Sequence, residues 1–397
     1  MTGVQTCALP ISLTTGTTLL APTFYQGLHL PWTVDLLADQ RNGGAVAWGI
    51  GELPTLILAL LVTLAWVRSD AAETTRLDRQ ADRDDDAELK ASTRTWPRFR
   101  NVQAGLGPPH RPWETDMRIA VIQLGYDDRE TVVDRVTRAA DLVRAQAGQD
   151  LVVLPELWAP GGFSYRTWVE RAEAVDGPVA SAMSAAARDA GVLLHAGSIV
   201  ERPADGARGP EGKGLWNTSL VFAADGSLVA TYRKIHRFGF GRGEPVLMEA
   251  GDSLSLVEVP DSSPCDGAAR AGLSTCYDLR FPELYRAQLD AGATLFVIPA
   301  AWPAARVRHW TLLAHARAIE NQCVVVACNT AGTHAGVEMG GHSQVVLPTG
   351  DVAVMAGRDE QVLNVEVDMR VVSDYRTSFP VLHDRRLPLG SRPALRI

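Results

Sequence analysis

Short apolar runs alternate with amphipathic segments along most of the chain, beginning at residue 117. The run at 117–124 has the length of a buried strand, and residues 131–147 carry apolar side chains at the three- and four-residue spacing of a helix. An apolar run at 151–155 and an amphipathic segment at 178–190 repeat the pattern. Such alternation is typical of α/β proteins, in which helices cover the faces of a sheet. We therefore expect one α/β domain over residues 117–397.

The first 116 residues follow a different pattern. Residues 45–67 form an apolar run of 23 residues with Glu52 as its only ionisable side chain, long enough to cross a hydrocarbon layer of about 30 Å. The alternative is a buried helix interrupted at Pro54, because a carboxylate facing lipid costs on the order of 3 kcal/mol. We expect a membrane segment with a charged tail in residues 1–90, with a transmembrane helix at about 45–67, and a linker at 91–116.

The composition excludes several classes of protein. Hydrophobic residues make up 46% and charged residues 21%, which is enough apolar material for a core and rules out a disordered or collagen-like chain. The net charge is −8 and no long basic run is present, so we expect no nucleic-acid partner, because phosphate contacts need clustered Lys and Arg. The five cysteines form no CxxC pair, which argues against a disulfide framework or zinc site and fits a cytoplasmic domain.

Three apolar runs end in reactive side chains, namely Glu156, Lys234 and Cys276. The ends of strands are where α/β proteins place their sites. Cys276 stands at a predicted strand-to-helix turn, so its thiol would be exposed at the apex and the N–H of Tyr277 could point at a developing oxyanion. Taken singly, each side chain is better explained by structure, as a packed thiol, a surface carboxylate and a lysine at a strand end.

A catalytic thiol at this turn would need a base, because an ordinary pKa of about 8.5 leaves only a small fraction ionised at neutral pH. The usual helper is histidine, but none of the nine histidines stands in the context of a cysteine protease. Glu156 offers another solution, since a half-buried carboxylate with a raised pKa can take the thiol proton and give it to a leaving amine. Lys234, held cationic beside it, can stabilise the oxyanion.

Taken together, the three segments are far more specific. PELW around Glu156, YRKIH around Lys234 and STCYDLRFPELYR around Cys276 resemble the Glu-Lys-Cys triad of the nitrilase (carbon-nitrogen hydrolase) superfamily, and the resemblance covers residues 117 to about 388. It implies a four-layer α-β-β-α sandwich, assembly into dimers or larger homo-oligomers, and no metal or organic cofactor. A non-catalytic member of the fold is disfavoured because all three side chains are present.

The same resemblance implies a role for each residue. Glu156 acts as general base on Cys276, whose thiolate attacks an amide carbonyl and forms a thioester that water hydrolyses. Lys234 and the N–H of Tyr277 stabilise the tetrahedral intermediate. Glu244 matches the second active-site glutamate of the family and takes a supporting role.

The sequence around Cys276 looks most like the ω-amidase branch, which implies a small carboxamide substrate, an ω-amide of an α-keto dicarboxylic acid. Nitrile hydrolysis and N-carbamoyl hydrolysis within the same superfamily are the alternatives. A substrate carboxylate needs a cation in the pocket, but an ion pair with Asp278 or Glu283 is an equally good interpretation of Arg280. The candidate substrate-binding residues are Phe163, Tyr165, Arg280, Trp302 and Arg306, with Arg308 as a third candidate cation.

The N-terminal region carries a separate resemblance. Residues 20–89 are similar to the C-terminal end of CtaG-type cytochrome c oxidase assembly membrane proteins, and residues 1–12 resemble translated sequencing-adapter read-through. A membrane assembly protein acting through this region is therefore a competing function. We expect residues 1–116 to derive from a truncated neighbouring gene joined by a frameshift or assembly error, with Met117 as the natural start.

Overall fold

The computed structural model describes residues 116–260 and 269–387, together with isolated stretches between residues 15 and 61. The chain divides into two units, Met1–Pro97 and Arg98–Ile397. In the first unit, residues 36–43 form a helix, and the Asp35 carboxylate accepts hydrogen bonds from the first backbone N–H groups of that helix.

Most of the region predicted to contact a membrane lies outside the described residues. This holds for the predicted span at 45–67, the charged tail and the linker at 91–116, apart from residues 45, 46, 61 and 116. Among the residues that the structure does describe, no helix has both the length and the hydropathy needed to cross a membrane.

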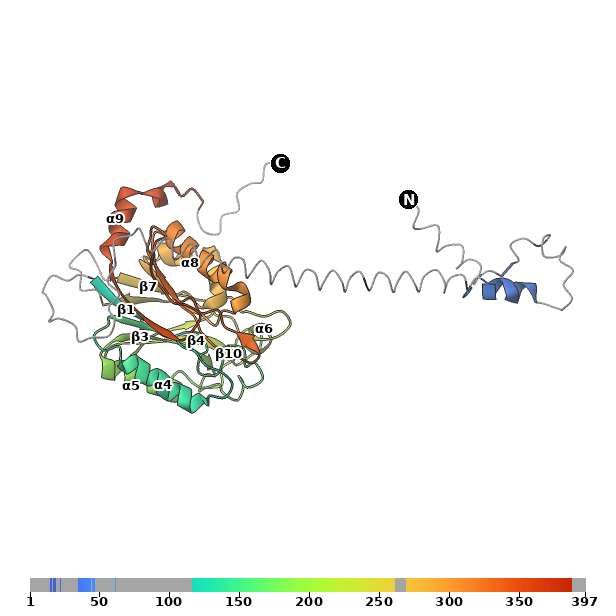
Figure 1. Ribbon diagram of the computed structural model, residues 1–397, viewed down its shortest axis with the longest axis horizontal. Helices are drawn as coiled ribbons and strands as arrows, with labels where there is room; N and C mark the ends of the chain where they lie inside the picture. The colour runs from blue at the N-terminus through green and yellow to red at the C-terminus, as the bar shows by residue number, and fades with distance from the viewer. Residues whose placement is uncertain are drawn as a thin grey trace. The chain divides into compact units, whose positions relative to one another are not determined.

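The second unit is built on two mixed sheets of six strands each, ordered β14-β1-β2-β3-β4-β5 and β13-β12-β9-β8-β7-β6 (Figure 1). The strands of the first sheet are β14 (Gln361–Asp368), β1 (Asp116–Gln123), β2 (Leu151–Val153), β3 (Leu193–Glu201), β4 (Trp216–Phe222) and β5 (Leu228–Arg233). Those of the second are β13 (Val352–Met355), β12 (Gln344–Val346), β9 (Val324–Cys328), β8 (Leu295–Pro299), β7 (Ala269–Leu273) and β6 (Leu256–Val259). The central strands β1, β2 and β3 run parallel, as do β7, β8 and β9.

Helices and a small hairpin complete the unit. The helices are α4 (Val132–Arg144), α5 (Pro178–Ala190), α6 (Glu244–Leu247), α7 (Pro282–Asp290), α8 (Val307–Asn321) and α9 (Arg370–Ser378). Short 3-10 helices are η1 (Cys276–Arg280), η2 (Ala304–Arg306) and η3 (Val381–Asp384), and β10 (Thr333–His334) pairs with β11 (Val337–Glu338). Helix α4 begins after Thr131, whose hydroxyl accepts a hydrogen bond from Asp134 N at 3.1 Å.

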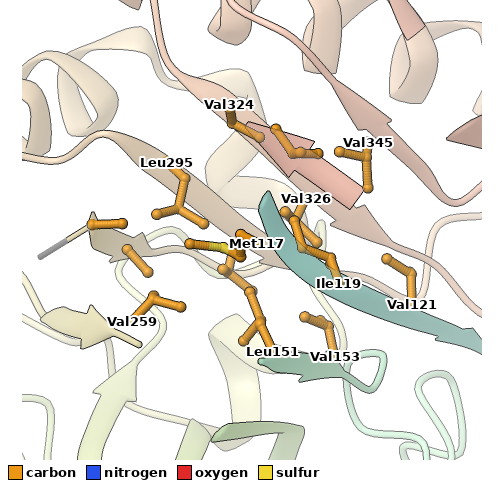
Figure 2. Packing of buried hydrophobic residues seen from close by; sticks show 14 of the residues in the cluster. Met117, Ile119, Val121, Leu151, Val153, Val259, Leu295, Val324, Val326 and Val345 are labelled. Carbon is orange, nitrogen blue, oxygen red and sulfur yellow. The ribbon is translucent and has the colours of Figure 1, made fainter. Parts of the chain in front are cut away.

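One apolar cluster fills the space between the sheets. Met117, Ile119 and Val121 of β1 point into it from one side, and Val324 and Val326 of β9 from the other (Figure 2). All five are at most 1% exposed. Because side chains alternate along a strand, the intervening residues of each strand face outward and need a helical cover.

Helices supply that cover on both outer faces. Ile122 of β1 packs in one cluster with Met183 of α5, whereas Phe296 of β8 packs with Trp310 of α8. Figure 1 shows α4 and α5 on one side of the paired sheets and α8 on the other. The predicted α-β-β-α sandwich is therefore confirmed.

Candidate active site

The predicted triad residues lie just beyond the ends of three strands. Glu156 follows β2, Lys234 directly follows β5, and Cys276 opens the 3-10 helix after β7. Glu244, the first residue of α6, joins them. All four residues are nearly enclosed, with exposed fractions of 3% for Glu156, 2% for Lys234, 7% for Cys276 and 3% for Glu244.

Lys234 joins the two carboxylates. Its Nζ lies 2.7 Å from Glu156 Oε1 and 3.0 Å from Glu244 Oε1. The backbone N–H of Ala301, beyond the end of β8, donates to Glu156 Oε2 at 2.9 Å. Glu156 is therefore held by donors from both sheets, and its Oε2 keeps one lone pair for a further proton.

Asn217 completes this cluster, although the sequence analysis passed over it. Its Nδ2 donates to Glu156 Oε1 at 2.8 Å and to Glu244 Oε1 at 2.5 Å. The signal was present in the sequence, because Asn217 is a polar residue in the buried strand β4 and a buried amide requires partners. The amide holds together two carboxylates that would otherwise repel each other.

The charges in the cluster favour a cationic lysine and a neutral thiol. Burial opposes the charged form of Lys234, but the carboxylates of Glu156 and Glu244 outweigh it and hold the lysine pKa well above its usual range. Burial, followed by the negative charge of Glu156, raises the pKa of the Cys276 thiol well above its usual range. Burial also raises the pKa of Glu244. The Cys276 thiol therefore keeps its proton at rest, and it would need a base to act as a nucleophile.

The backbone at Cys276 is unusual. Cys276 has a φ of 49°, in the left-handed region that non-glycine residues rarely adopt. The turn is held by a capping box, in which the Thr275 side chain accepts from the Asp278 N–H and the Asp278 carboxylate accepts from Thr275 N at 2.9 Å. Tyr277 is the second residue of this turn, and the first N–H groups of a helical turn have no acceptor within it.

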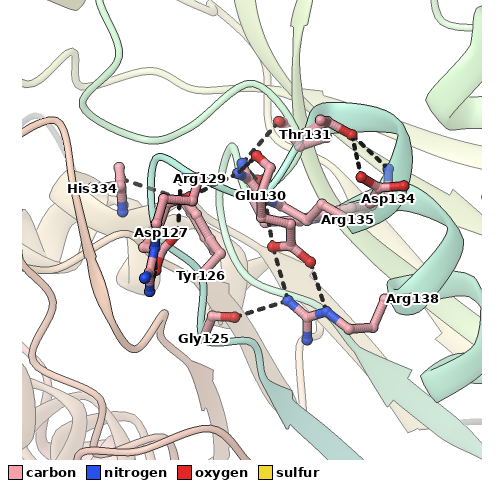
Figure 3. Close-up of polar contacts among 12 residues, drawn as sticks. Gly125, Tyr126, Asp127, Arg129, Glu130, Thr131, Asp134, Arg135, Arg138 and His334 are labelled. Carbon is pink, nitrogen blue, oxygen red and sulfur yellow. Dashed lines mark hydrogen bonds and ion pairs between the residues drawn. The ribbon is translucent and has the colours of Figure 1, made fainter.

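The segment that follows β1 forms a network of polar contacts over residues 125–138 (Figure 3), and two of its side chains also hold the loop after Glu156. Tyr126 Oη accepts a hydrogen bond from Gly162 N at 3.3 Å, and its ring stacks on His334 with centroids 4.4 Å apart. The Arg135 guanidinium donates to the carbonyls of Trp158 and Ala159. These contacts hold the segment that carries Phe163 and Tyr165.

The predicted substrate-binding residues form a connected group of rings and guanidinium groups. Phe163 lies 5.8 Å from Tyr165 and 6.2 Å from Phe238, measured between ring centroids. Phe238, which the sequence analysis did not single out, lies 5.3 Å from the Tyr277 ring. The Arg306 Cζ stands 5.6 Å from the centroid of Phe238.

Arg280 joins this group rather than an acidic partner. Its Cζ lies 4.8 Å from the Trp302 ring centroid and its NH2 lies 3.2 Å from His309 Nδ1. Among the ion pairs of residues 116–260 and 269–387, none joins Arg280 to Asp278 or Glu283, the alternative that the sequence left open. Burial, together with the positive charge of Arg306, lowers the pKa of Arg280.

Arg308, the third candidate cation, lies close enough to His309 to act on its pKa together with the other two arginines. Burial and then the charges of Arg280, Arg306 and Arg308 lower the pKa of His309. The neighbourhood of His309 is therefore strongly positive in a chain whose net charge is −8.

Within the described part of the chain, no cluster of three or more His, Cys, Asp or Glu side chains is arranged to hold a metal ion.

Known proteins resemble this chain over the residues that carry the site. Residues 118–377 match the family model described as carbon-nitrogen hydrolase, and residues 1–69 match that of the cytochrome c oxidase caa3 assembly factor CtaG. The 2-oxoglutaramate amidase of Paenarthrobacter nicotinovorans is 46% identical, covering 69% of this chain and 91% of that protein. The Homo sapiens ω-amidase NIT2 is 35% identical, covering 69% and 97%.

A solved structure also resembles the part of this chain that carries the site. A CN-hydrolase superfamily protein from Xanthomonas campestris, with an arsenic adduct in its active site, superposes with a TM-score of 0.60 at 30% identity. The match covers 71% of this chain and 99% of that one. Both predicted family resemblances are thereby confirmed.

Proposed function

Because this chain belongs to the carbon-nitrogen hydrolase family and is a hydrolase that acts on amides, we propose that it cleaves a small ω-amide of an α-keto dicarboxylic acid to the carboxylate and ammonia. The observation that carries the proposal is the pair Arg280 and Arg306 beside the buried Cys276, Glu156 and Lys234. The 2-oxoglutaramate amidase and ω-amidase activities named for the relatives agree with it.

The first half of the reaction forms a thioester. Glu156 takes the proton of the Cys276 thiol as the sulfur attacks the amide carbonyl carbon. The carbonyl oxygen becomes an oxyanion, which the Lys234 ammonium and the N–H of Tyr277 stabilise. The C–N bond then breaks, and Glu156 gives its proton to the departing nitrogen, so that ammonia leaves and the acyl group stays on sulfur.

The second half returns the enzyme to its starting state. Glu156 takes a proton from water, the hydroxide attacks the thioester carbonyl, and the C–S bond breaks with the proton returning to sulfur. Glu244 supports both halves, because it binds Lys234 Nζ and accepts the Phe238 N–H at 2.5 Å. It thus holds the lysine in place.

The substrate carboxylate binds to the arginines. Arg280 has no acidic partner among the described ion pairs, and the aromatic walls of Phe163, Tyr165 and Trp302 suit the short carbon chain of such an amide. Arg306 adds a second cation over Phe238. A neutral amide would leave both charges uncompensated, so we propose that this enzyme prefers anionic amides.

The test is ammonia release from 2-oxoglutaramate, 2-oxosuccinamate, glutamine, asparagine, aliphatic amides and nitriles, with amine release from N-carbamoyl compounds measured in parallel. We expect turnover of the keto-acid amides that is lost in Cys276→Ala and retained in Cys323→Ala. Cys323 is a matched control because it is a buried free thiol outside the cluster. Turnover of a nitrile or an N-carbamoyl compound alone would replace the proposed substrate.

We also propose a homodimer formed through the outer face of α8. Leu312 is 57% exposed and Ile319 is 48% exposed, and the two lie two turns apart on this helix. Apolar side chains aligned on one face are typical of an interface between copies. Sedimentation of Leu312→Glu should show a monomer if this face forms the dimer, and an unchanged dimer would contradict the proposal.

We propose that the whole chain comprises a membrane segment in residues 1–90, a linker at 91–116 and the hydrolase domain at 117–397. We propose that the domain is cytoplasmic, which is supported by the free thiols of Cys276, Cys323 and Cys328. If residues 45–67 anchor it to the plasma membrane, the full chain should sediment with membranes, and recovery of all activity in the supernatant would contradict an anchor.

A further inference from the structure

One fully buried carboxylate outside the catalytic cluster connects two segments of the active site. Asp278 is 0% exposed and lies two residues after Cys276 in η1 (Cys276–Arg280), which we call the nucleophile turn. Its Oδ2 accepts from Thr275 N at 2.9 Å and from Tyr232 Oη at 2.8 Å. Its Oδ1 accepts from His236 N at 2.9 Å and lies 2.8 Å from His236 Nδ1. All four acceptor positions of the carboxylate are therefore used.

The partners of Asp278 flank the catalytic lysine. Tyr232, Lys234 and His236 follow one another at every second position of the chain, at and beyond the end of β5. Asp278 binds the first and the third, whereas Lys234 reaches Glu156 and Glu244. The carboxylate thus holds the lysine segment on both sides of Lys234 and holds the nucleophile turn through Thr275.

Each partner is itself fixed. Burial and the charge of Asp278 raise the pKa of Tyr232 well above its usual range, so the phenol stays protonated and donates. The ring of His236 stacks on Phe281 with centroids 3.8 Å apart and an interplanar angle of 7°. Phe281 is the residue that ends the nucleophile turn, so the His236 ring contacts this turn at a second point.

We infer that Asp278, with Tyr232 and His236, is a positioning residue that sets the distance between the Cys276 sulfur and the Lys234 ammonium. Cys276 sits in a backbone region that is unfavourable for a residue with a side chain, and the cap made by Asp278 holds the turn there. Lys234 lies on the other sheet, so contacts within the turn alone do not fix its distance from the sulfur. Asp278 supplies the connection.

The consequence is a larger effect on chemistry than on binding. Asp278 makes no direct contact with the rings and arginines proposed to bind substrate, but Arg280 ends the same turn. A loosened turn should therefore lower kcat by a larger factor than it raises KM. A displacement of about 1 Å between reacting groups can lower a rate by a factor of about 100. The inference rests on the roles proposed above for Cys276 and Lys234.

The experiment compares four variants of the full chain. Asp278→Asn keeps the shape of the side chain but replaces one carboxylate oxygen by an NH2 group, which cannot accept the hydrogen bonds that the neighbouring groups donate. Tyr232→Phe and His236→Gln each remove one of these donors. Glu201→Gln is the matched control, because Glu201 is a buried carboxylate that accepts from Thr218 and Arg233 without touching the nucleophile turn. Melting temperature, kcat, KM and the rate of Cys276 alkylation by iodoacetamide are measured for each.

We expect Asp278→Asn to lower kcat by a factor of about 100 and to slow alkylation, with KM changed by a smaller factor than kcat. Tyr232→Phe and His236→Gln should give smaller losses of the same kind. Glu201→Gln should lower the melting temperature while keeping kcat within about twofold of the parent.

Two outcomes would overturn the inference. The first is a folded Asp278→Asn with the kcat and alkylation rate of the parent. If that variant does not fold, the second is full kcat in both Tyr232→Phe and His236→Gln. The alkylation rate does not depend on the substrate, and Cys276→Ala in the same assay tests the proposed function separately. Turnover retained by Cys276→Ala would remove the proposed function, whereas an inactive Cys276→Ala beside a fully active Asp278→Asn would remove this inference alone.

Discussion

Replacement of Glu156 by glutamine is the most direct test of the proposed chemistry, and the structure gives its expected effect on both folding and rate. The carboxylate accepts three hydrogen bonds, from Lys234 and Asn217 on Oε1 and from Ala301 N on Oε2. In the variant the amide oxygen takes the Oε1 place, where the cation lies. The amide nitrogen then faces the Ala301 N–H, and that hydrogen bond is lost.

The stability cost of this change is limited. One unsatisfied buried donor costs about 1–3 kcal/mol. The loss of the ion pair with Lys234 is partly offset, because Glu244 remains beside the lysine at 3.0 Å and no longer faces a second carboxylate across Asn217. We expect Glu156→Gln to fold, with a melting temperature lower by several degrees.

The effect on rate should be much larger. A general base contributes a factor of about 10² to 10⁴, and a factor of 100 corresponds to about 2.7 kcal/mol of transition-state stabilisation. Ammonia release and thermal unfolding are measured on the same preparation. A folded Glu156→Gln that keeps more than about a tenth of the parent kcat would refute the assignment of Glu156 as the base.

Three further predictions concern binding, pH dependence and stability. Arg280→Gln and Arg306→Gln should each raise KM for keto-acid amides about tenfold or more while leaving KM for a neutral aliphatic amide unchanged, because a charge-assisted hydrogen bond is worth about 1.5–3 kcal/mol; equal effects on both substrates in steady-state kinetics would contradict carboxylate binding. Asn217→Leu removes a donor that lowers the pKa of Glu244, so that pKa should rise further and the acid limb of the pH profile of kcat/KM should move to higher pH; an unmoved limb would show that the amide does not act through Glu244. Burial lowers the pKa of both His195 and His334 to about 4, so each stabilises the folded state fully above about pH 6.5 and loses that contribution, about 3 kcal/mol, as the pH falls towards 4. Denaturant unfolding of His334→Gln should show a weaker loss of stability over this range than the parent, and an identical pH dependence would exclude the histidine as a cause.

The sequence predicted the central strands and the triad because both leave local signals. Ile119 to Ile122 and Leu151 to Val153 are continuous apolar runs, as expected of parallel strands covered on both faces. Strand β14 was not predicted, although its buried Leu363, Val365 and Val367 alternate with polar residues, as is typical of a strand at the edge of a sheet. The three reactive side chains stood at strand ends, and the resemblance of their motifs gave them their roles.

Other parts of the site depend on contacts between segments far apart in the sequence. Arg280 had two equal interpretations, because Asp278 and Glu283 are close to it in sequence. Only the tertiary structure shows that Tyr232 and His236 donate hydrogen bonds to the Asp278 carboxylate, in the place of Arg280. Phe238 likewise gains its place only when the loop before α6 folds against Tyr277. No periodicity reports such contacts.

The proposed catalytic groups come from both sheets, with Glu156, Asn217 and Lys234 supplied by the first and Cys276 and the Ala301 N–H supplied by the second. The apolar layer between the sheets therefore acts as the spacer of the active site. Directed evolution that repacks this layer can tune turnover without altering any residue that meets the substrate. Cutting the chain between β5 and β6 would separate Glu156 and Lys234 from Cys276, so neither fragment should turn over substrate. Recovery of activity on mixing the two fragments would report that the sheets have reassembled, with β14 of the C-terminal fragment again paired with β1.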